Sequence, residues 1–312
     1  MLSSVGTWVW VLFNLGVIVM LLLDLGVFHR HAHRVSVREA AFWSVFWIAL
    51  ALAFNVAIYF WMGAETAMEY LTGYLIEKSL SVDNLFVFAL IFSYFRVPAQ
   101  YQHRVLFWGI LGALVMRGTL IFLGTSLISR FHWVFYLFGA LLLFSGYRML
   151  RHDKESEELD PEKNPVVRIA RKVIPVTPHY VGEHLFSRID GVLHATPLFV
   201  VLLVVESTDL VFAIDSIPAI FAITQDPFIV YTSNVFAILG LRSLYFLLAH
   251  VLDSFRYLSK GLALVLMFIG VKMLVVDLVH IPVGVSLGVV LGVVAVSIAL
   301  SLWVRAKEAP QS

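Results

Sequence analysis

Long apolar stretches separated by short polar connections set the pattern along this chain. Nine stretches meet the requirement of roughly 20 residues for a helix that crosses a bilayer. They lie near residues 6–28, 40–62, 70–95, 104–126, 131–150, 195–222, 229–252, 261–280 and 283–304. The pattern predicts an all-α, polytopic membrane protein with about nine transmembrane helices.

The composition agrees with this fold class. The chain is 60% hydrophobic and 14% charged, whereas a soluble domain is typically about half apolar and a quarter charged. A net charge of +1 without a basic block gives no indication of a nucleic-acid partner. The chain has no cysteine, which excludes disulfides and thiolate metal sites. With no nucleophile–base motif, phosphate loop or cofactor fingerprint, we expect neither an enzyme nor a prosthetic group.

The positive charges predict the orientation in the membrane. Of the 22 Lys and Arg residues, seventeen fall in connections on one side and only Arg130 on the other. Connections on the cytoplasmic side are enriched in Lys and Arg. We therefore expect the N-terminus outside and the C-terminus inside. The remaining four bases fall within spans: Lys78, Arg117, Arg242 and Lys272.

Two halves of the chain resemble each other at an offset of about 125 residues. Ser81-Val-Asp83 pairs with Ser207-Thr-Asp209, and Leu142-Leu-Phe-Ser-Gly146 pairs with Leu266-Met-Phe-Ile-Gly270. Each unit holds three predicted helices, an odd number, so the two units would have opposite orientations. Inverted repeats are typical of secondary transporters, whose substrate site lies near the midplane where the repeats meet.

The repeat divides one transmembrane domain, residues 1–312, into consecutive parts. These are two N-terminal helices (1–69), repeat 1 (70–150), a cytosolic linker (151–194), repeat 2 (195–280), and a last helix with a tail (281–312). The linker is acidic at its start and rich in proline, so we expect at most a short helix around residues 166–173.

Acidic residues inside the membrane mark the candidate site. Each costs at least a few kcal/mol there, so such residues usually line an ion or proton path. Their carboxylates, with neighbouring amide and hydroxyl groups, are hard oxygen ligands that suit Mg²⁺, Ca²⁺ or Mn²⁺. The predicted metal ligands are Glu77, Asp83, Asn84, Glu206, Asp209 and Asp215. The predicted supporting residues are Ser81, Ser207, Arg117, Arg242 and Asp24.

Two questions about this site stay open at the level of sequence. Arg117 and Arg242 occupy equivalent repeat positions, and each could neutralise an acid in a purely structural pair. Seven acids against four bases within the spans would still leave an excess of negative charge for protons or metal ions. Pro218 predicts a break or kink just after Asp215. Either that break gathers the acids, or Asp215 serves a gate or a proton relay.

Several motifs resemble the TerC family of integral membrane proteins, which includes Alx-type members. They are Glu77-Lys-Ser-Leu-Ser-Val-Asp-Asn84, Thr196-Pro-Leu, Glu206-Ser-Thr-Asp-Leu-Val-Phe-Ala-Ile-Asp215-Ser-Ile-Pro and Thr232-Ser-Asn-Val-Phe-Ala-Ile-Leu-Gly-Leu-Arg242. The resemblance implies a carrier of the LysE-like group that is associated with manganese export. It carries the family's acidic positions to Glu77, Asp83, Glu206, Asp209 and Asp215. It also implies the inner (plasma) membrane of a bacterium.

We therefore expect a secondary transporter that exports a divalent cation, Mn²⁺ by resemblance, in exchange for protons. Its partners would be the lipid bilayer, the metal ion and protons, with a homo-oligomer left open. One alternative is a membrane scaffold or insertion partner in metal or envelope stress responses, without transport. Another is an exchanger of Ca²⁺ or a different divalent cation.

Overall fold

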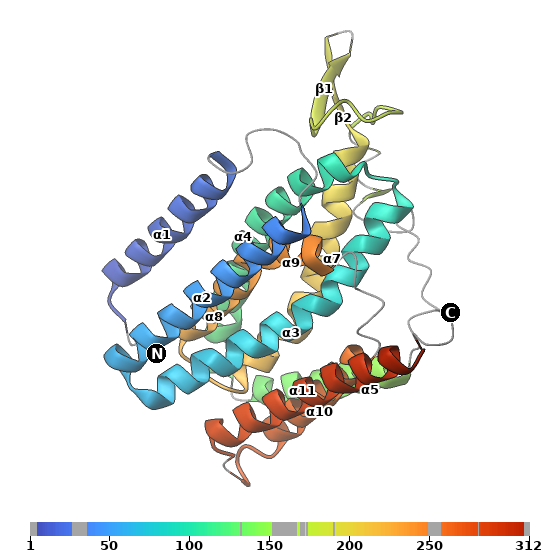
Figure 1. Ribbon diagram of the computed structural model, residues 1–312. Coiled ribbons are helices and arrows are strands. Elements are labelled where there is room, and N and C mark those ends of the chain that lie inside the picture. The colour runs from blue at the N-terminus through green and yellow to red at the C-terminus, as the bar shows by residue number, and fades with distance from the viewer. Residues whose placement is uncertain are drawn as a thin grey trace.

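The computed structural model describes residues 5–26, 36–131, 133–151, 167–168, 172, 174–189, 191–248, 257–279 and 281–308. Helices dominate it (Figure 1). They are α1 (Thr7–Gly26), α2 (Val37–Met62), α3 (Ala64–Tyr94), α4 (Ala99–Arg130), α5 (Trp133–Arg151), α7 (Pro197–Phe221), α8 (Pro227–Leu239), α9 (Leu241–Leu248), α10 (Leu258–Leu274) and α11 (Val283–Glu308). Each predicted apolar stretch coincides with one helix, except 229–252, which is divided between α8 and α9.

Six helical segments are long and apolar enough to cross a bilayer: α2, α4, α5, α7, the α8–α9 run Pro227–Leu247, and α11. Among the others, α3 is 31 residues long but carries charged residues along its length. The apolar part of α1 is shorter, and α10 has 17 residues. The multi-pass helical membrane fold is therefore confirmed, while the number nine and the orientation stay predictions.

A β-hairpin departs from the all-α prediction. Strands β1 (Phe186–Ile189) and β2 (Val192–Ala195) pair antiparallel, with Ile189 opposite Val192. The sequence Asp190-Gly191 between them is a strong signal for a two-residue hairpin turn, and Gly191 has a φ of +80°, which suits glycine. The hairpin lies in the segment predicted as linker, most of whose expected short helix (166–173) falls outside the described residues.

The hairpin is tied to the membrane helices by hydrogen bonds. The Thr196 hydroxyl donates to the carbonyl of His184 at 2.7 Å, directly before α7 begins. The Tyr180 hydroxyl donates to the carbonyl of Phe95 at the end of α3, at 2.8 Å. Burial raises the pKa of Tyr180, which keeps its hydroxyl a donor. The hairpin is thus fixed to α3 and α7 and projects away from the bundle (Figure 1).

The helices of the two halves of the chain interlock. Helix α3 packs against α8 and α7, α4 packs against α7 and α8, and α5 packs most extensively against α10. Helix α2 covers α3 and α9, while α11 covers α10 and α3. Helices α5, α10 and α11 run side by side as a layer on one side of the bundle (Figure 1).

Glycines allow the closest of these helix contacts. A Cβ atom added at Gly139 in α5 would lie 3.0 Å from the carbonyl oxygen of Gly270 in α10. One added at Gly270 would lie 2.8 Å from the carbonyl oxygen of Gly139. Small residues are common where membrane helices approach backbone to backbone. Here they bring one helix of each half into direct contact.

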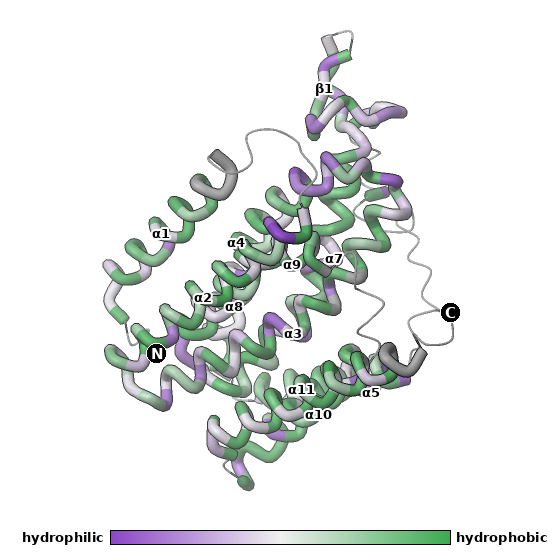
Figure 2. Tube along the Cα trace, in the orientation of Figure 1, coloured by the Kyte–Doolittle hydropathy of each residue, from purple (hydrophilic) through white to green (hydrophobic). Residues whose placement is uncertain are grey.

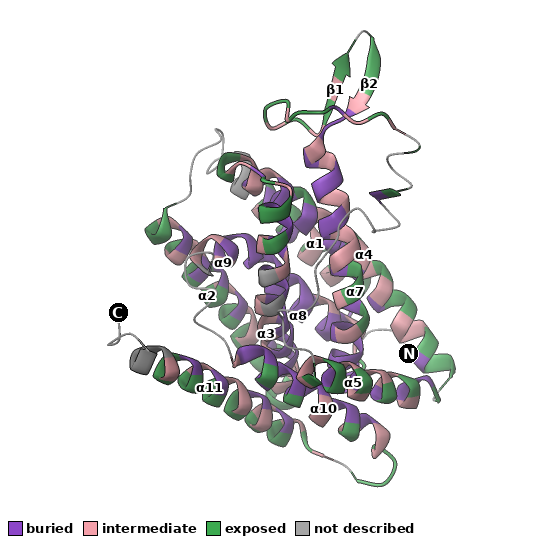
Figure 3. Cartoon of the chain, turned by 90° about the vertical axis from the view of Figure 1, so that its right-hand side faces the viewer, coloured by how far each residue is buried: buried purple, intermediate pink, exposed green. Residues whose placement is uncertain are grey.

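The outer surface is apolar, unlike that of a soluble protein. Large apolar side chains cover the outside of the helices, for example Trp8, Leu12, Phe60 and Phe122, and hydrophilic residues along the helices are few (Figure 2). Such a surface suits lipid tails. The buried faces of α3, α7 and α8 point inward (Figure 3) and carry the polar residues that form the candidate site.

Candidate functional site

Arg117 of α4 is the centre of a buried polar cluster. Its side chain is 1% exposed and forms a two-pronged contact with Asp209 of α7. Nε donates to Oδ2 at 3.0 Å, and Nη2 donates to Oδ1 at 2.7 Å. This fork-to-carboxylate geometry is the strong, directional form of the Arg–Asp pair.

A second carboxylate shares the same guanidinium. Nη1 of Arg117 donates to Oε1 of Glu77 in α3, whose side chain is fully buried. Nη1 also lies 3.2 Å from Oδ1 of Asn234 in α8 and 3.5 Å from Oγ of Ser216 in α7. The amide of Asn234 donates in turn to the other oxygen of Glu77, at 3.2 Å. Side chains from four helices therefore meet at one guanidinium.

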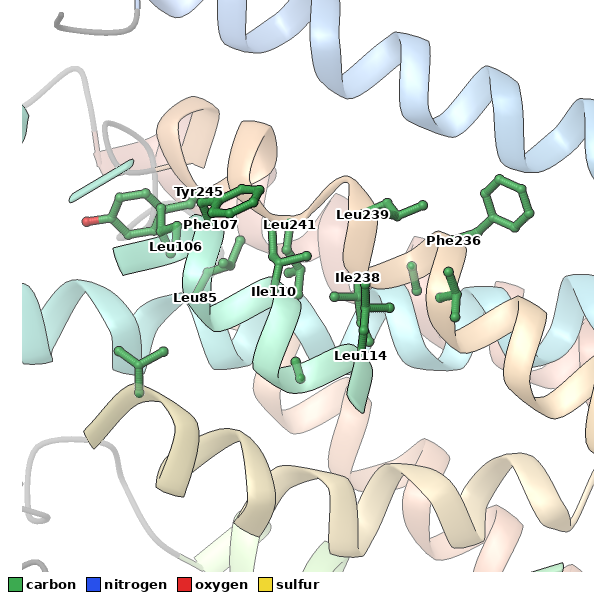
Figure 4. Packing of buried hydrophobic residues seen from close by; sticks show 14 of the residues in the cluster. Leu85, Leu106, Phe107, Ile110, Leu114, Phe236, Ile238, Leu239, Leu241 and Tyr245 are labelled. Carbon is green, nitrogen blue, oxygen red and sulfur yellow. The ribbon is translucent and has the colours of Figure 1, made fainter. Parts of the chain in front are cut away.

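Apolar packing keeps this cluster dry. Leu114 and Ile110, which precede Arg117 on α4, pack toward Ile238 and Leu241 of α8 and α9 (Figure 4). Electrostatic interactions are stronger in such surroundings than in water. Two carboxylates and one guanidinium leave the cluster one formal negative charge in excess.

Glu206 lies beside the cluster without belonging to it. It precedes Asp209 by three residues on α7, so the two side chains are neighbours on one helix face. A Cβ atom added at Gly112 of α4 would lie 2.0 Å from Oε1 of Glu206. The carboxylate therefore rests on the backbone of α4, in space that only glycine leaves open. Its side chain is partly exposed, unlike Glu77 and Asp209.

Asp215 faces a different helix. Ser145 of α5 donates to Oδ1 of Asp215 at 2.7 Å, and the side chain is partly exposed. Of the predicted break or kink after Asp215, the break is wrong, because α7 is described throughout and continues from Pro197 through Pro218 to Phe221; the kink stays a prediction. A proline in a helix interior removes only one amide donor, and neighbouring helices can support the chain there. Asp215 is consequently not gathered with Glu77 and Asp209.

The helix break lies elsewhere, at Gly240 between α8 and α9. Lys78 of α3 donates to the carbonyl of Ala237 at 3.2 Å, near the C-terminal end of α8. A Cβ atom added at Gly240 would lie 2.8 Å from Nζ of Lys78 and 3.1 Å from Cβ of Trp47. A cationic side chain is well placed at a helix C-terminus, where carbonyl groups lack intrahelical donors.

The remaining predicted residues have separate positions. Ser81 and Asn84 are buried on α3, and Oγ of Ser81 has no hydrogen-bond partner within the described part of the chain. Ser207 donates to the carbonyl of Val204 in its own helix. Arg242 is buried in α9, next to Trp43 and Trp47. The side chains of Asp83 and Asp24 lie outside what the structure describes, although both residues fall within helices.

Of the six predicted ligands, the structure brings together Glu77 and Asp209, and Arg117 joins them. Within the described residues, no group of three His, Asp or Glu side chains is placed to hold a metal ion. Asn234 and Ser216 are members of the cluster that the sequence did not single out. The sequence does contain a signal for both residues, because each is a polar residue within an apolar run: Thr232-Ser-Asn234 and Asp215-Ser216.

Comparison with known proteins gives consistent results across the chain. The integral membrane protein TerC family matches residues 62–309. An uncharacterized membrane protein of Myxococcus xanthus is 51% identical over 311 residues, covering 99% of this chain and 96% of that protein. The proposed membrane-bound redox modulator Alx of Escherichia coli (strain K12) is 49% identical over 322 residues, covering 99% of both chains. An uncharacterized membrane protein of Rickettsia bellii is 42% identical and covers 89% of this chain and 91% of its own. No solved structure matches the chain.

Proposed function

The chain belongs to the TerC family of integral membrane proteins, and from this we propose that it is a secondary transporter that exports a divalent cation in exchange for protons. Manganese is the ion that the family resemblance favours. The transporter would be a carrier rather than an enzyme and would need no prosthetic group. Its proposed partners are the bilayer, the metal ion and protons, with a homo-oligomer left open.

The observation that carries this proposal is the buried pair Glu77 and Asp209. Both carboxylates lie inside a membrane protein, and one guanidinium does not balance them. Carboxylates in such surroundings are costly unless they serve ion or proton movement. The oxygens of Asn234 and Ser216 complete a set of hard ligands that suits Mn²⁺, Mg²⁺ or Ca²⁺.

The packing of the helices supports the inverted-repeat arrangement. If α3, α4 and α5 correspond to α7, α8–α9 and α10, the contact of α3 with α8 is equivalent to that of α7 with α4. The contact of α5 with α10 then joins the third helix of one unit to the third helix of the other. The Glu77–Arg117–Asp209 cluster lies where the two units meet, which is the place of the substrate site in carriers built this way.

Sidedness and location follow the same reasoning. The Lys and Arg distribution supports an outside N-terminus and an inside C-terminus. The relatives are bacterial proteins, which supports the inner membrane of a bacterium. Redox modulation, named for the Alx relatives, cannot proceed through thiols in this chain because it has no cysteine. We propose that any redox effect follows from the ion that is moved.

Flux measurements with purified protein in liposomes test this function. Mn²⁺, Ca²⁺, Mg²⁺ and Zn²⁺ are supplied separately, with and without an imposed pH gradient. We expect gradient-driven Mn²⁺ movement that is lost in Asp209→Asn and Asp215→Asn, both of which still insert into the membrane. Full Mn²⁺ flux by Asp209→Asn would refute the assignment, and preference for Ca²⁺ would establish the calcium alternative.

The pairing of Glu77 and Asp209 with Arg117 also favours one rival, a membrane scaffold or insertion partner whose acids serve folding alone. That function predicts no stabilisation of the solubilised protein by metal ions. A rise in unfolding temperature with Mn²⁺, absent in Glu77→Gln and Asp209→Asn, would exclude it.

A further inference from the structure

We propose that Arg117 is a built-in competitor of the transported cation, its guanidinium filling the oxygen cage that the cation occupies during transport. Loading of the cation then requires the guanidinium to leave. The inference rests on the proposed function, since it concerns the same cage. It adds what holds the empty site together and what the incoming ion must displace.

The number and type of atoms around Arg117 support this reading. Five oxygen atoms converge on the guanidinium: both of Asp209, one each of Glu77 and Asn234, and the hydroxyl of Ser216. All are hard donors of the kind that divalent cations take in sets of six to eight. They come from α3, α7 and α8, so Arg117 fastens three helices to α4, whereas a metal ion in its place would join those three helices to one another.

The cage has no room for both cations. Arg117 is 1% exposed and contacts every one of these groups. A divalent ion bound to the same carboxylates would lie against the guanidinium, and two like charges in a dry interior repel strongly. Binding of the ion and binding of Arg117 in the cage therefore exclude each other.

Glu206 is the destination for the displaced guanidinium. Its carboxylate rests against Gly112, which lies five residues before Arg117, or about 7.5 Å along a helix. Asp209, which already accepts hydrogen bonds from Nε and Nη2 of Arg117, lies three residues after Glu206 on α7, so the two carboxylates are neighbours on one helix face. Formally, Glu77, Asp209 and Glu206 with Arg117 sum to two negative charges, which one divalent ion neutralises. Lys78 stays apart, because it is bonded to the carbonyl of Ala237.

The test is equilibrium Mn²⁺ binding and thermal unfolding of the full-length protein in detergent. Arg117→Gln removes the competitor, so we expect it to bind Mn²⁺ at least tenfold more tightly than the wild type. Its unfolding temperature should fall without metal and recover more with Mn²⁺ than that of the wild type. The double variant Arg117→Gln/Asp209→Asn is the matched control, because the cage then has the same formal charge of −1 as in the wild type but one carboxylate fewer, and we expect Mn²⁺ binding to be lost.

A second variant tests the destination. Glu206→Gln keeps Arg117 and the cage but removes the acceptor of the guanidinium, so Mn²⁺ binding should weaken about tenfold in the wild-type background. It should have no such effect when Arg117 is already Gln. This dependence of one substitution on the other distinguishes a relay between the two residues from independent roles.

Contrary outcomes are distinct for the inference and for the function. If Arg117→Gln binds Mn²⁺ no more tightly than the wild type while Glu77→Gln abolishes binding, the competitor role is wrong and the transport function stands. If Arg117→Gln cannot be recovered even with Mn²⁺ present throughout purification, the competitor role is wrong too, since the ion fails to replace the guanidinium. If neither the wild type nor any variant binds or moves a divalent ion, the proposed function itself fails.

Discussion

The contribution of a single residue to the stability of this protein depends more on its surroundings than on its residue type. Asp209 and Asp215 lie on one helix, six residues apart, yet the first is buried against a guanidinium and the second accepts one hydrogen bond from Ser145 at a partly exposed position. A hydrogen bond to a buried charged group contributes more to stability than an ordinary hydrogen bond at a partly exposed position. The two aspartates should therefore respond differently to the same substitution.

We expect Asp209→Asn to lower the free energy of unfolding by about 1.5–3 kcal/mol, because a charge-assisted hydrogen bond to Arg117 is lost while Glu77 still balances the guanidinium. Asp215→Asn should cost about 1 kcal/mol, the value of one ordinary hydrogen bond. Urea or thermal unfolding in one detergent measures both. Equal losses for the two variants would contradict the burial and contacts described for Asp209.

Gly112 gives a second residue-level prediction. In Gly112→Ala the new methyl group would overlap Oε1 of Glu206, so the carboxylate must move away from α4. We expect little change in stability, because the overlapping atoms are the far end of a flexible side chain, and a several-fold loss of Mn²⁺ flux. Gly292→Ala in α11 is the control, because nothing lies within 4 Å of its added Cβ. Unchanged flux in Gly112→Ala would show that the position of Glu206 is unimportant.

At the scale of elements, helix continuity is decided by neighbouring helices as well as by the local sequence. Helix α7 passes through Pro218 without ending, whereas the next apolar run ends α8 at Leu239 and restarts at Leu241. Proline predicts a break by removing a donor, but one lost hydrogen bond does not end a packed helix. The helix is interrupted at Gly240, where Lys78 of α3 and Trp47 of α2 leave little room for a side chain.

Gly240→Ala tests this account of the break. Alanine favours a helix interior over glycine by about 1 kcal/mol, yet its methyl group would meet Nζ of Lys78 and Cβ of Trp47. Because Cβ of Trp47 is anchored to the backbone, we expect a net loss of about 1–3 kcal/mol in unfolding free energy. In Gly288→Ala of α11, which has open space, stability should be unchanged or slightly higher. A stabilised Gly240→Ala would mean that α8 and α9 join without strain.

At the scale of the whole molecule, the sequence predicts the membrane-embedded helices well and their mutual contacts poorly. Apolar runs of spanning length locate the described helices from α1 to α5 and from α7 to α11, because length and hydropathy are local properties. The hairpin differs from the predicted linker, although Asp190-Gly191 signals a turn, because a polar, proline-rich segment is also typical of a linker. Burial of acids was predicted, but which acids meet depends on packing between α3, α4, α7 and α8. Packing of α8 against α3 and α4 brings Asn234 into the cluster.

Orientation in the membrane is the whole-molecule property that can be tested most directly. The chain has no cysteine, so one introduced thiol reports its own location. Val279→Cys, exposed between α10 and α11, should react with a membrane-impermeant maleimide in intact cells. Val192→Cys, exposed in the hairpin, should react only after the membrane is opened. The reverse pattern would invert the assigned orientation.

The backbone contact between Gly139 of α5 and Gly270 of α10 limits how the protein can move. These helices come from the two halves of the chain, and their carbonyl oxygens are too close to the facing glycines for either helix to carry a side chain there. If the halves tilted past each other as complete blocks, this seam would have to open. In the transporter that we propose, alternation between an outward and an inward form would therefore be confined to α3, α4, α7, α8 and α9, with α5 and α10 held together.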